Sequence, residues 1–134
     1  MPAVPHSLSV STGSGRLDLS AQAVWVGPDL VVLVTGGELP HVGAVAMAAP
    51  RPSLADPAVT SATASVFTYP SHKEDRLAQA TAELLSAKLK TRVVVTAGCH
   101  WDGLEPEGIK QVSANGRRLG QMLLEALLAQ RGTA

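Results

Sequence analysis

The sequence is poor in aromatic residues and contains a single cysteine. Its 134 residues include two Trp, one Tyr and one Phe, so the core must rely on Val, Leu and Ala. Cys99 alone cannot form a disulfide within the chain, which favours a reducing compartment. No apolar run approaches the roughly 20 residues of a membrane span, and residues 1–20 lack the apolar stretch of a signal peptide. These absences predict a soluble, cytoplasmic protein.

The sequence also lacks an excess of charge of either sign. Lys and Arg together number 11, as do Asp and Glu, and the formal net charge is zero. A nucleic-acid binder needs a basic surface, so this balance argues against that class. The length suits one domain. We expect a flexible N-terminal arm over residues 1–15, in which residues 7–10 could add an edge strand, and a single domain over residues 16–134.

Alternating and apolar runs predict four strands in the first half of the chain. Residues 16–26 and 30–35 flank a Gly-Pro-Asp turn and read as a hairpin. Residues 42–49 predict a third strand, which the prolines of Pro50-Arg51-Pro52 should end because they lack the N–H that a ladder needs. Residues 60–69 predict a fourth strand with hydroxyls on one face, which either meets solvent or lines a polar pocket.

Helical periodicity dominates the second half. Ser71 and Glu74 have the spacing of a capping box, with Ser71 as N-cap, and a strand over residues 92–97 follows to complete a βαβ crossover. Pro106 suits the first turn of a last helix, which Asn115-Gly116 should bend or split. Helical spacing predicts the two core faces as Leu77, Ala80, Thr81, Leu84, Leu85, Lys88 and Leu89, and as Ile109, Val112, Leu119, Leu123, Ala126 and Leu127.

These elements predict an α+β (or α/β) domain. A single mixed sheet of about five strands would carry two helices packed on one face. The other face of the sheet must then be polar or covered, and a homodimer would cover it.

Three of the four histidines fall at the ends of predicted elements. His41 opens the third strand, His72 begins the first helix, and His100 follows the strand at residues 92–97. Binding groups gather on loops that rigid elements hold, and ligands bind at the carboxyl ends of parallel strands. The pattern therefore predicts one site assembled from three distant segments.

Several chemistries remain open for this site. The helix start at His72 and Lys73 could bind a phosphate, or it could be a solvated cap. His100 and Asp102, two residues apart, should point to the same side, which suits proton transfer or two metal ligands shared with His41 and His72. No compact metal motif supports the metal interpretation, which is not favoured.

Two other segments carry reactive groups. Cys99 and His100 should point to opposite sides of a strand, so we expect an inert, buried thiol rather than a nucleophile. Arg51 and Ser53 lie in the proline-stiffened segment, where Arg51 could bind a phosphate or carboxylate, although an ordinary exposed loop fits equally well. No glycine-rich nucleotide motif occurs.

Five segments follow one another in order and without large gaps between about Gly37 and Asn115. They are His41-Val42-Gly43-Ala44-Val45-Ala46, Pro50-Arg51-Pro52-Ser53-Leu54, Ser61-Ala62-Thr63-Ala64-Ser65-Val66, His72-Lys73-Glu74-Asp75 and Ala97-Gly98-Cys99-His100-Trp101-Asp102. Together they resemble the LpdD-like prenylated-flavin chaperone domain. Gly103 departs from the pattern, which has Asn after the Asp.

The resemblance implies a non-catalytic accessory protein that binds prenylated FMN (or FMN). It would deliver this cofactor to a UbiD-type aromatic acid decarboxylase, in a system that includes a flavin prenyltransferase. Carried over by position, the candidate cofactor contacts are His41, Arg51, Ser53, His72, Lys73, His100 and Asp102. The alternatives are a small metal-dependent enzyme that uses His41, His72, His100 and Asp102, or a structural subunit whose histidines are incidental.

Overall fold

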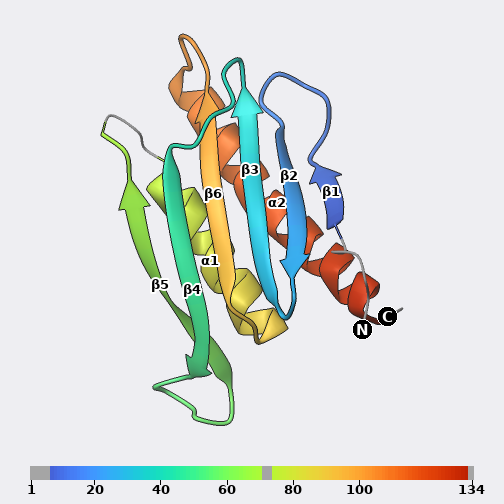
Figure 1. Ribbon diagram of the computed structural model, residues 1–134. Coiled ribbons are helices and arrows are strands. Elements are labelled where there is room, and N and C mark those ends of the chain that lie inside the picture. Colours follow the sequence, from blue (N-terminus) through green and yellow to red (C-terminus); the bar gives the residue numbers. More distant parts are fainter. Residues whose placement is uncertain (1–6, 71–73, 133–134) are drawn as a thin grey trace.

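A mixed six-stranded sheet carries two helices on one of its faces, as the computed structural model of residues 7–70 and 74–132 shows (Figure 1). The sheet order is β1-β2-β3-β6-β4-β5, and β3 pairs with β6 in parallel while the other pairs are antiparallel. The elements are β1 Ser7–Ser11, β2 Leu19–Val26, β3 Asp29–Gly37, β4 Ala44–Pro52, β5 Thr60–Thr68, α1 Asp75–Leu89, β6 Val93–His100 and α2 Pro106–Gly132. The predicted α+β class is confirmed, with a sixth strand at the edge where residues 7–10 could add one.

The β2–β3 hairpin forms as its turn residues predict. Val26 pairs with Asp29, and Gly27 adopts a φ of 60°, a left-handed conformation that costs glycine little. Further along, β5 and β6 are both antiparallel to β4, which lies between them, so β5 and β6 run parallel to each other. The segment β5–α1–β6 is therefore the predicted crossover, with β4 inserted between its two strands.

The prediction that Pro50 and Pro52 end regular structure is wrong, because β4 continues to Pro52. Pairing of β4 with β6 stops at Ala48, and beyond it β4 pairs only with β5. The N–H of Ser53 donates to the carbonyl of Val59 across that hairpin at 2.8 Å. Strand alternation then turns the nitrogens of Pro50 and Pro52 toward the unpaired side, where no ladder bond is lost.

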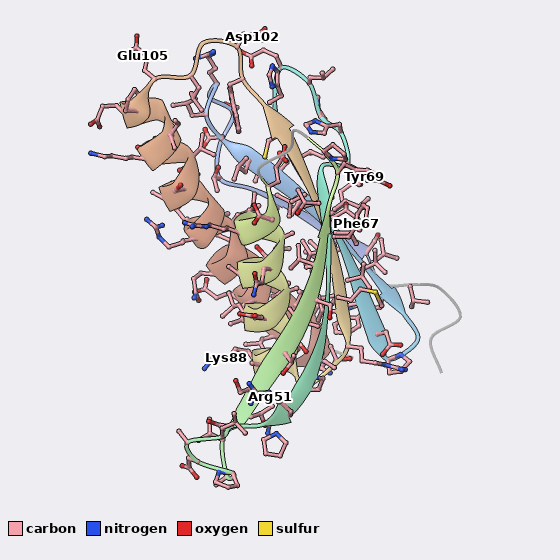
Figure 2. All side chains as sticks on the ribbon, turned by 90° about the vertical axis from the view of Figure 1, so that its left-hand side faces the viewer. Arg51, Phe67, Tyr69, Lys88, Asp102 and Glu105 are labelled. Atoms are coloured by element: carbon pink, nitrogen blue, oxygen red, sulfur yellow. The ribbon has the colours of Figure 1, made fainter. Side chains whose placement is uncertain are left out.

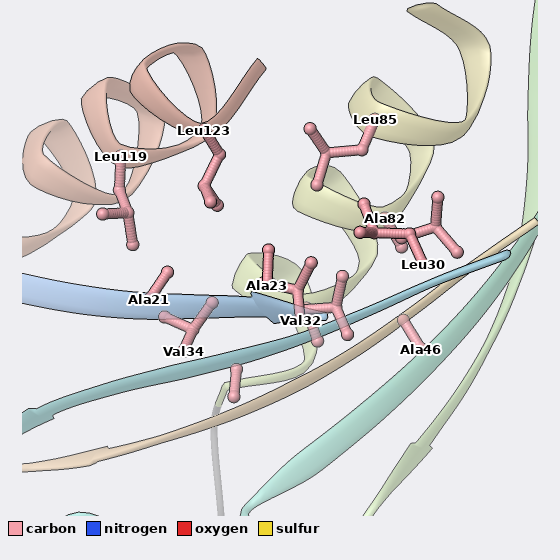
Figure 3. Close-up of a cluster of buried hydrophobic side chains, with 14 of the residues drawn as sticks. Ala21, Ala23, Leu30, Val32, Val34, Ala46, Ala82, Leu85, Leu119 and Leu123 are labelled. Carbon is pink, nitrogen blue, oxygen red and sulfur yellow. The ribbon is translucent and has the colours of Figure 1, made fainter. Parts of the chain in front are cut away.

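Small side chains on the sheet and leucines on the helices form the core. Ala21, Ala23 and Ala46 on the strands are buried beneath Leu85 of α1 and Leu119 and Leu123 of α2 (Figure 3). Burial of each leucine contributes about 1.5–3 kcal/mol. Alanines on the strands let the helix leucines approach closely, which explains how a chain with four aromatic residues fills its core.

The structure corrects three details of the first helix. It begins at Asp75 with Glu74 as N-cap, so the capping box that placed Glu74 in the third helical position is wrong. Ser71 and His72 themselves lie outside the described residues. The helix buries Ala78, Thr81, Ala82, Leu85, Ser86 and Leu89, whereas Ala80 and Lys88, predicted for the core face, are exposed.

The last helix is continuous through Asn115-Gly116, so the predicted break is wrong. Asn115 Nδ2 donates to the Leu17 carbonyl at 2.8 Å, and a Cβ on Gly116 would lie 2.9 Å from Leu77 Cδ1. Asn115 and Gly116 are therefore buried where α2 packs against the segment before β2 and against α1. Ile109, predicted for the core, is exposed. No helix in the described ranges is long and apolar enough to cross a membrane.

Candidate functional site

The loop before β4 and the start of α1 meet the carboxyl end of β6. The loop at residues 38–43 lies against the strand end, with the Glu38 N–H on the His100 carbonyl at 2.8 Å and the Gly43 N–H on the Ala97 carbonyl at 3.0 Å. A Cβ on Gly98 would lie 1.7 Å from the carbonyl oxygen of His41. Glycine is therefore required at this position for the loop to pack on the strand.

His41 forms an ion pair with Glu74, the residue that caps α1. Its Nε2 lies 3.2 Å from Glu74 Oε1, and its Nδ1 lies 2.8 Å from the Leu39 carbonyl oxygen. The Leu39 carbonyl and the Glu74 carboxylate both accept hydrogen bonds, so either can pair with a ring N–H of His41. The side chains of His41 and Glu74 are 22% and 10% exposed. The pair ties the loop at residues 38–43 to the helix start.

Glu74 also fixes the end of β6. Its Oε1 accepts a hydrogen bond from the Cys99 backbone N–H at 3.3 Å. The Cys99 side chain packs against the core, whereas His100 is exposed, so the two point to opposite faces as expected. Burial, and then the nearby Glu74 carboxylate, raise the pKa of the Cys99 thiol to about 12. The thiol stays protonated at neutral pH and is no nucleophile, in agreement with the sequence.

We predict that Cys99 reacts slowly with Ellman's reagent at pH 8 in the folded protein and rapidly once urea unfolds the chain. Because folding raises the thiol pKa from 9.0 to about 12, the protonated thiol contributes stability below about pH 9 that is lost as the pH rises toward 12. Cys99→Ala should therefore remove part of the loss of stability between pH 9 and pH 11 in urea titrations. Equal labelling rates for folded and unfolded protein would contradict the prediction.

His100 and Asp102 form a second, exposed pair, with His100 Nε2 at 2.9 Å from Asp102 Oδ1. Arg16 supports this segment from another part of the chain, because its Nη2 donates to the Asp102 carbonyl at 2.8 Å and its Nε pairs with Glu38 Oε1 at 3.0 Å. The Trp101 indole N–H donates to the Arg16 carbonyl. Sequence reasoning missed Arg16, since nothing in its spacing links it to residues more than 80 positions away.

A groove of about 440 Å³ lies next to these pairs, at the carboxyl end of β3. Its lining combines glycine backbone, hydroxyls and charged groups: Gly13, Ser14, Gly15, Arg16, Asp18, Ser20, Thr35, Gly36, Gly37, Glu38 and Pro40. Hydrogen bonds from the Thr12 hydroxyl and then the Gly15 N–H lower the pKa of Asp18, so this wall carries an ionised carboxylate at neutral pH. The groove suits a polar, hydroxyl-bearing ligand.

The predicted site residues divide between the two ends of the sheet. His41, His100 and Asp102 lie at one end. Arg51 and Ser53 lie at the other, since Arg51 follows Ala44 by seven residues of strand, or about 24 Å. Figure 2 shows Arg51 and Asp102 at opposite ends. Arg51 Nε donates to Thr63 Oγ1 at 2.6 Å across the β4–β5 hairpin. His72 and Lys73 lie outside the described residues, so the structure does not place them.

The metal interpretation gains no support from this arrangement. Within residues 7–70 and 74–132, no three His, Cys, Asp or Glu side chains are grouped so that they could hold a metal ion. The described histidines at this end are engaged in two pairs, His41 with Glu74 and His100 with Asp102. A metal-dependent enzyme would need ligands from these pairs to converge.

The sequence profile of one family, the prenylated flavin chaperone LpdD-like domain, matches residues 13–128. The chain belongs to this family. The match spans both helices up to Leu128 and every strand except β1, and it includes the groove and the paired histidines. No curated protein matches the chain.

A solved structure has the same fold as this LpdD-like domain. It is a chain from the "Crystal Structure of a Novel Chaperone Complex for Yeast 20S Proteasome Assembly", at a TM-score of 0.60 and 14% sequence identity. The similarity covers 94% of this chain and 97% of that chain. At this identity the likeness establishes a shared fold and says nothing of a shared partner.

Proposed function

We propose that this domain is a cytoplasmic carrier of prenylated FMN, which accepts the cofactor from a flavin prenyltransferase and delivers it to a UbiD-type aromatic acid decarboxylase. It performs no chemistry of its own. The family match over residues 13–128 is the observation that carries the proposal. The fold and the groove add physical support, because ligands of α/β sheets bind at the carboxyl ends of parallel strands, where the groove lies.

The donor set of the groove fits such a ligand. Its volume of about 440 Å³ falls within the roughly 300–1,000 Å³ typical of small-molecule sites. The carboxylates of Asp18 and Glu38 can accept hydrogen bonds from ribityl hydroxyls of the ligand. Arg16 is the cation on the groove wall that can meet the phosphate. The prenylated flavin ring supplies the decarboxylation chemistry only when it is bound in the decarboxylase.

A carrier must release what it binds, and the arrangement favours release. The His100–Asp102 pair and the Arg16–Glu38 pair are both largely exposed, so their hydrogen bonds to a ligand compete with water. The protonated Cys99 thiol offers no covalent attachment. His72 and Lys73 remain proposed phosphate contacts.

We predict that the purified protein, mixed with reduced prenylated FMN in the absence of oxygen, retains a flavin spectrum after desalting. Arg16→Ala should weaken retention at least tenfold, because it removes the cation from the groove wall. Arg51→Ala is the matched control: it removes a cation from the opposite end of the sheet and should leave retention unchanged. Flavin that elutes separately from the wild-type protein would remove the cofactor proposal, and loss of retention in Arg51→Ala alone would move the site to the other end.

A further inference from the structure

The sheet has a second face, opposite the helices, that no element among residues 7–70 and 74–132 covers. In Figure 2 both helices lie on one side of the sheet, and Phe67 and Tyr69 project from the other. We call this side the open face. It carries exposed apolar side chains, including Phe67 and Met47, each 62% exposed, and Leu33 at 38%.

The strand register groups the apolar side chains of the open face into two adjacent rows. Leu33, Thr96, Val45 and Phe67 are consecutive cross-strand partners on β3, β6, β4 and β5. Val24, Val31, Val94 and Met47 form the neighbouring row on β2, β3, β6 and β4. Side chains in such rows stand about 5 Å apart and make one continuous surface. None of these eight residues is charged.

A polar rim of serine, threonine and glutamine surrounds this apolar centre. On the β1–β2 side it consists of Ser7, Ser9, Ser11, Ser20 and Gln22, and on β5 of Ser61, Thr63 and Ser65. Among the described residues, charged groups of this face lie only toward the strand ends, at Arg51 and at the Asp29–Arg92 pair. An apolar centre with a polar rim is the layout of a protein interface. A solvent-facing sheet would alternate charged residues along its exposed side.

We propose that the open face is the interface of a homodimer in which two copies pack sheet against sheet about a twofold axis. Two identical faces match in width. The twofold axis places the apolar centre of one copy against that of the other, and the polar rim of one against that of the other. The centre carries no charge, so nothing on it repels a second copy, and nothing on it offers the charge pattern that selects a different partner. This inference does not depend on the cofactor that the domain binds.

The size of the open face suits a stable dimer. Five strands about 4.8 Å apart and about 24 Å long give a projected area of about 600 Å². Side-chain relief raises the accessible area toward the roughly 800 Å² per partner of a standard interface. Stacked sheets lie about 10 Å apart, a spacing that Met47, Leu33 and Phe67 can fill from both sides. The groove and the histidine pairs lie at the ends of the strands, beyond this centre.

Sedimentation equilibrium at protein concentrations from 1 to 100 μM tests the inference. We expect the wild-type protein to have twice the monomer mass, and Met47→Lys to dissociate at least a hundredfold more readily, because it places two lysines in the apolar centre. Ile109→Lys is the matched control, because Ile109 is similarly exposed but lies on α2. It should remain a dimer. Circular dichroism melts check that both variants fold, and Phe67→Lys provides a second variant on the open face.

The oligomeric states of the wild-type protein and of the variants test the proposed interface. A wild-type monomer at 100 μM overturns the inference. A dimer that survives both Met47→Lys and Phe67→Lys, or that dissociates only in Ile109→Lys, places the interface elsewhere and also overturns it. A wild-type monomer that binds the decarboxylase, with binding lost in Met47→Lys, would assign the open face to that protein instead of a second copy. Flavin retention is measured on the same variants, so failure of the dimer and failure of the cofactor proposal are distinguishable.

Discussion

Replacing Gly98 with alanine is expected to lower the free energy of unfolding by about 3 kcal/mol, the upper range for overpacking a filled interior. The added Cβ would lie 1.7 Å from the His41 carbonyl oxygen and 2.3 Å from its carbonyl carbon. These are backbone atoms, so no side-chain rotation relieves the clash. The loop at residues 38–43 must move off β6, and the Gly43 N–H would lose its bond to the Ala97 carbonyl. In a domain of this size the melting temperature should fall by about 10 °C.

Gly103→Ala is the matched control for Gly98→Ala. Gly103 lies near the same end of the sheet, has a φ of 62° and has no atom within 4 Å of an added Cβ. Gly103→Ala should lower the free energy of unfolding by only about 1 kcal/mol, the strain of a left-handed backbone on alanine. Side-chain imidazole resonances in NMR spectra give a second readout: His41 should shift in Gly98→Ala and not in Gly103→Ala. A Gly98→Ala protein that melts like the wild type would mean that the loop does not pack on β6.

The sequence predicted the elements whose signals are local. The β2–β3 hairpin follows from Gly27-Pro28-Asp29 between two apolar runs, and the crossover helix follows from its leucine spacing. The predictions that failed concern residues whose side chains bind partners far away in the sequence. Glu74 matched a capping box, but its carboxylate is engaged by His41 and the Cys99 N–H. Asn115 looked like a break in α2, but its amide bonds the Leu17 carbonyl across the domain.

In the candidate site, too, only the contacts between residues close in sequence were predictable. Strand alternation predicted that His100 and Asp102 point to the same side, and His100 Nε2 lies 2.9 Å from Asp102 Oδ1. The pairing of His41 with Glu74 had no signal in sequence spacing, because β4 enters the sheet between the two strands that flank α1. Because β4 is antiparallel to β6, it leads away from His41 and His100. Arg51 therefore lies at the opposite end of the sheet. Resemblance by position could not reveal that separation.

Glu74→Ala is expected to cost about 2–3 kcal/mol, because it removes a largely buried carboxylate from two partners at once. The Cys99 N–H loses its acceptor and the His41 ring loses its carboxylate partner. Urea unfolding at pH 7 measures the loss. Asp102→Asn is the matched control, since it removes the carboxylate charge from the other histidine pair, where the side chains are 51% and 86% exposed. An exposed pair is screened by water, and this change should cost less than about 0.5 kcal/mol.

Glu74→Gln separates the charge of Glu74 from its hydrogen bonding. The amide oxygen still accepts from the Cys99 N–H, so we expect this variant to lose about 1 kcal/mol, less than Glu74→Ala. Burial is the larger cause of the raised Cys99 pKa and the Glu74 carboxylate the smaller. Glu74→Gln should therefore increase thiol alkylation at pH 9 by a small factor, without reaching the rate of the unfolded chain. If Glu74→Gln and Glu74→Ala cost the same, the stabilisation comes from the pairing of the Glu74 carboxylate with His41 rather than from its hydrogen bond with the Cys99 N–H. If neither costs more than Asp102→Asn, Glu74 does not join the three segments at all.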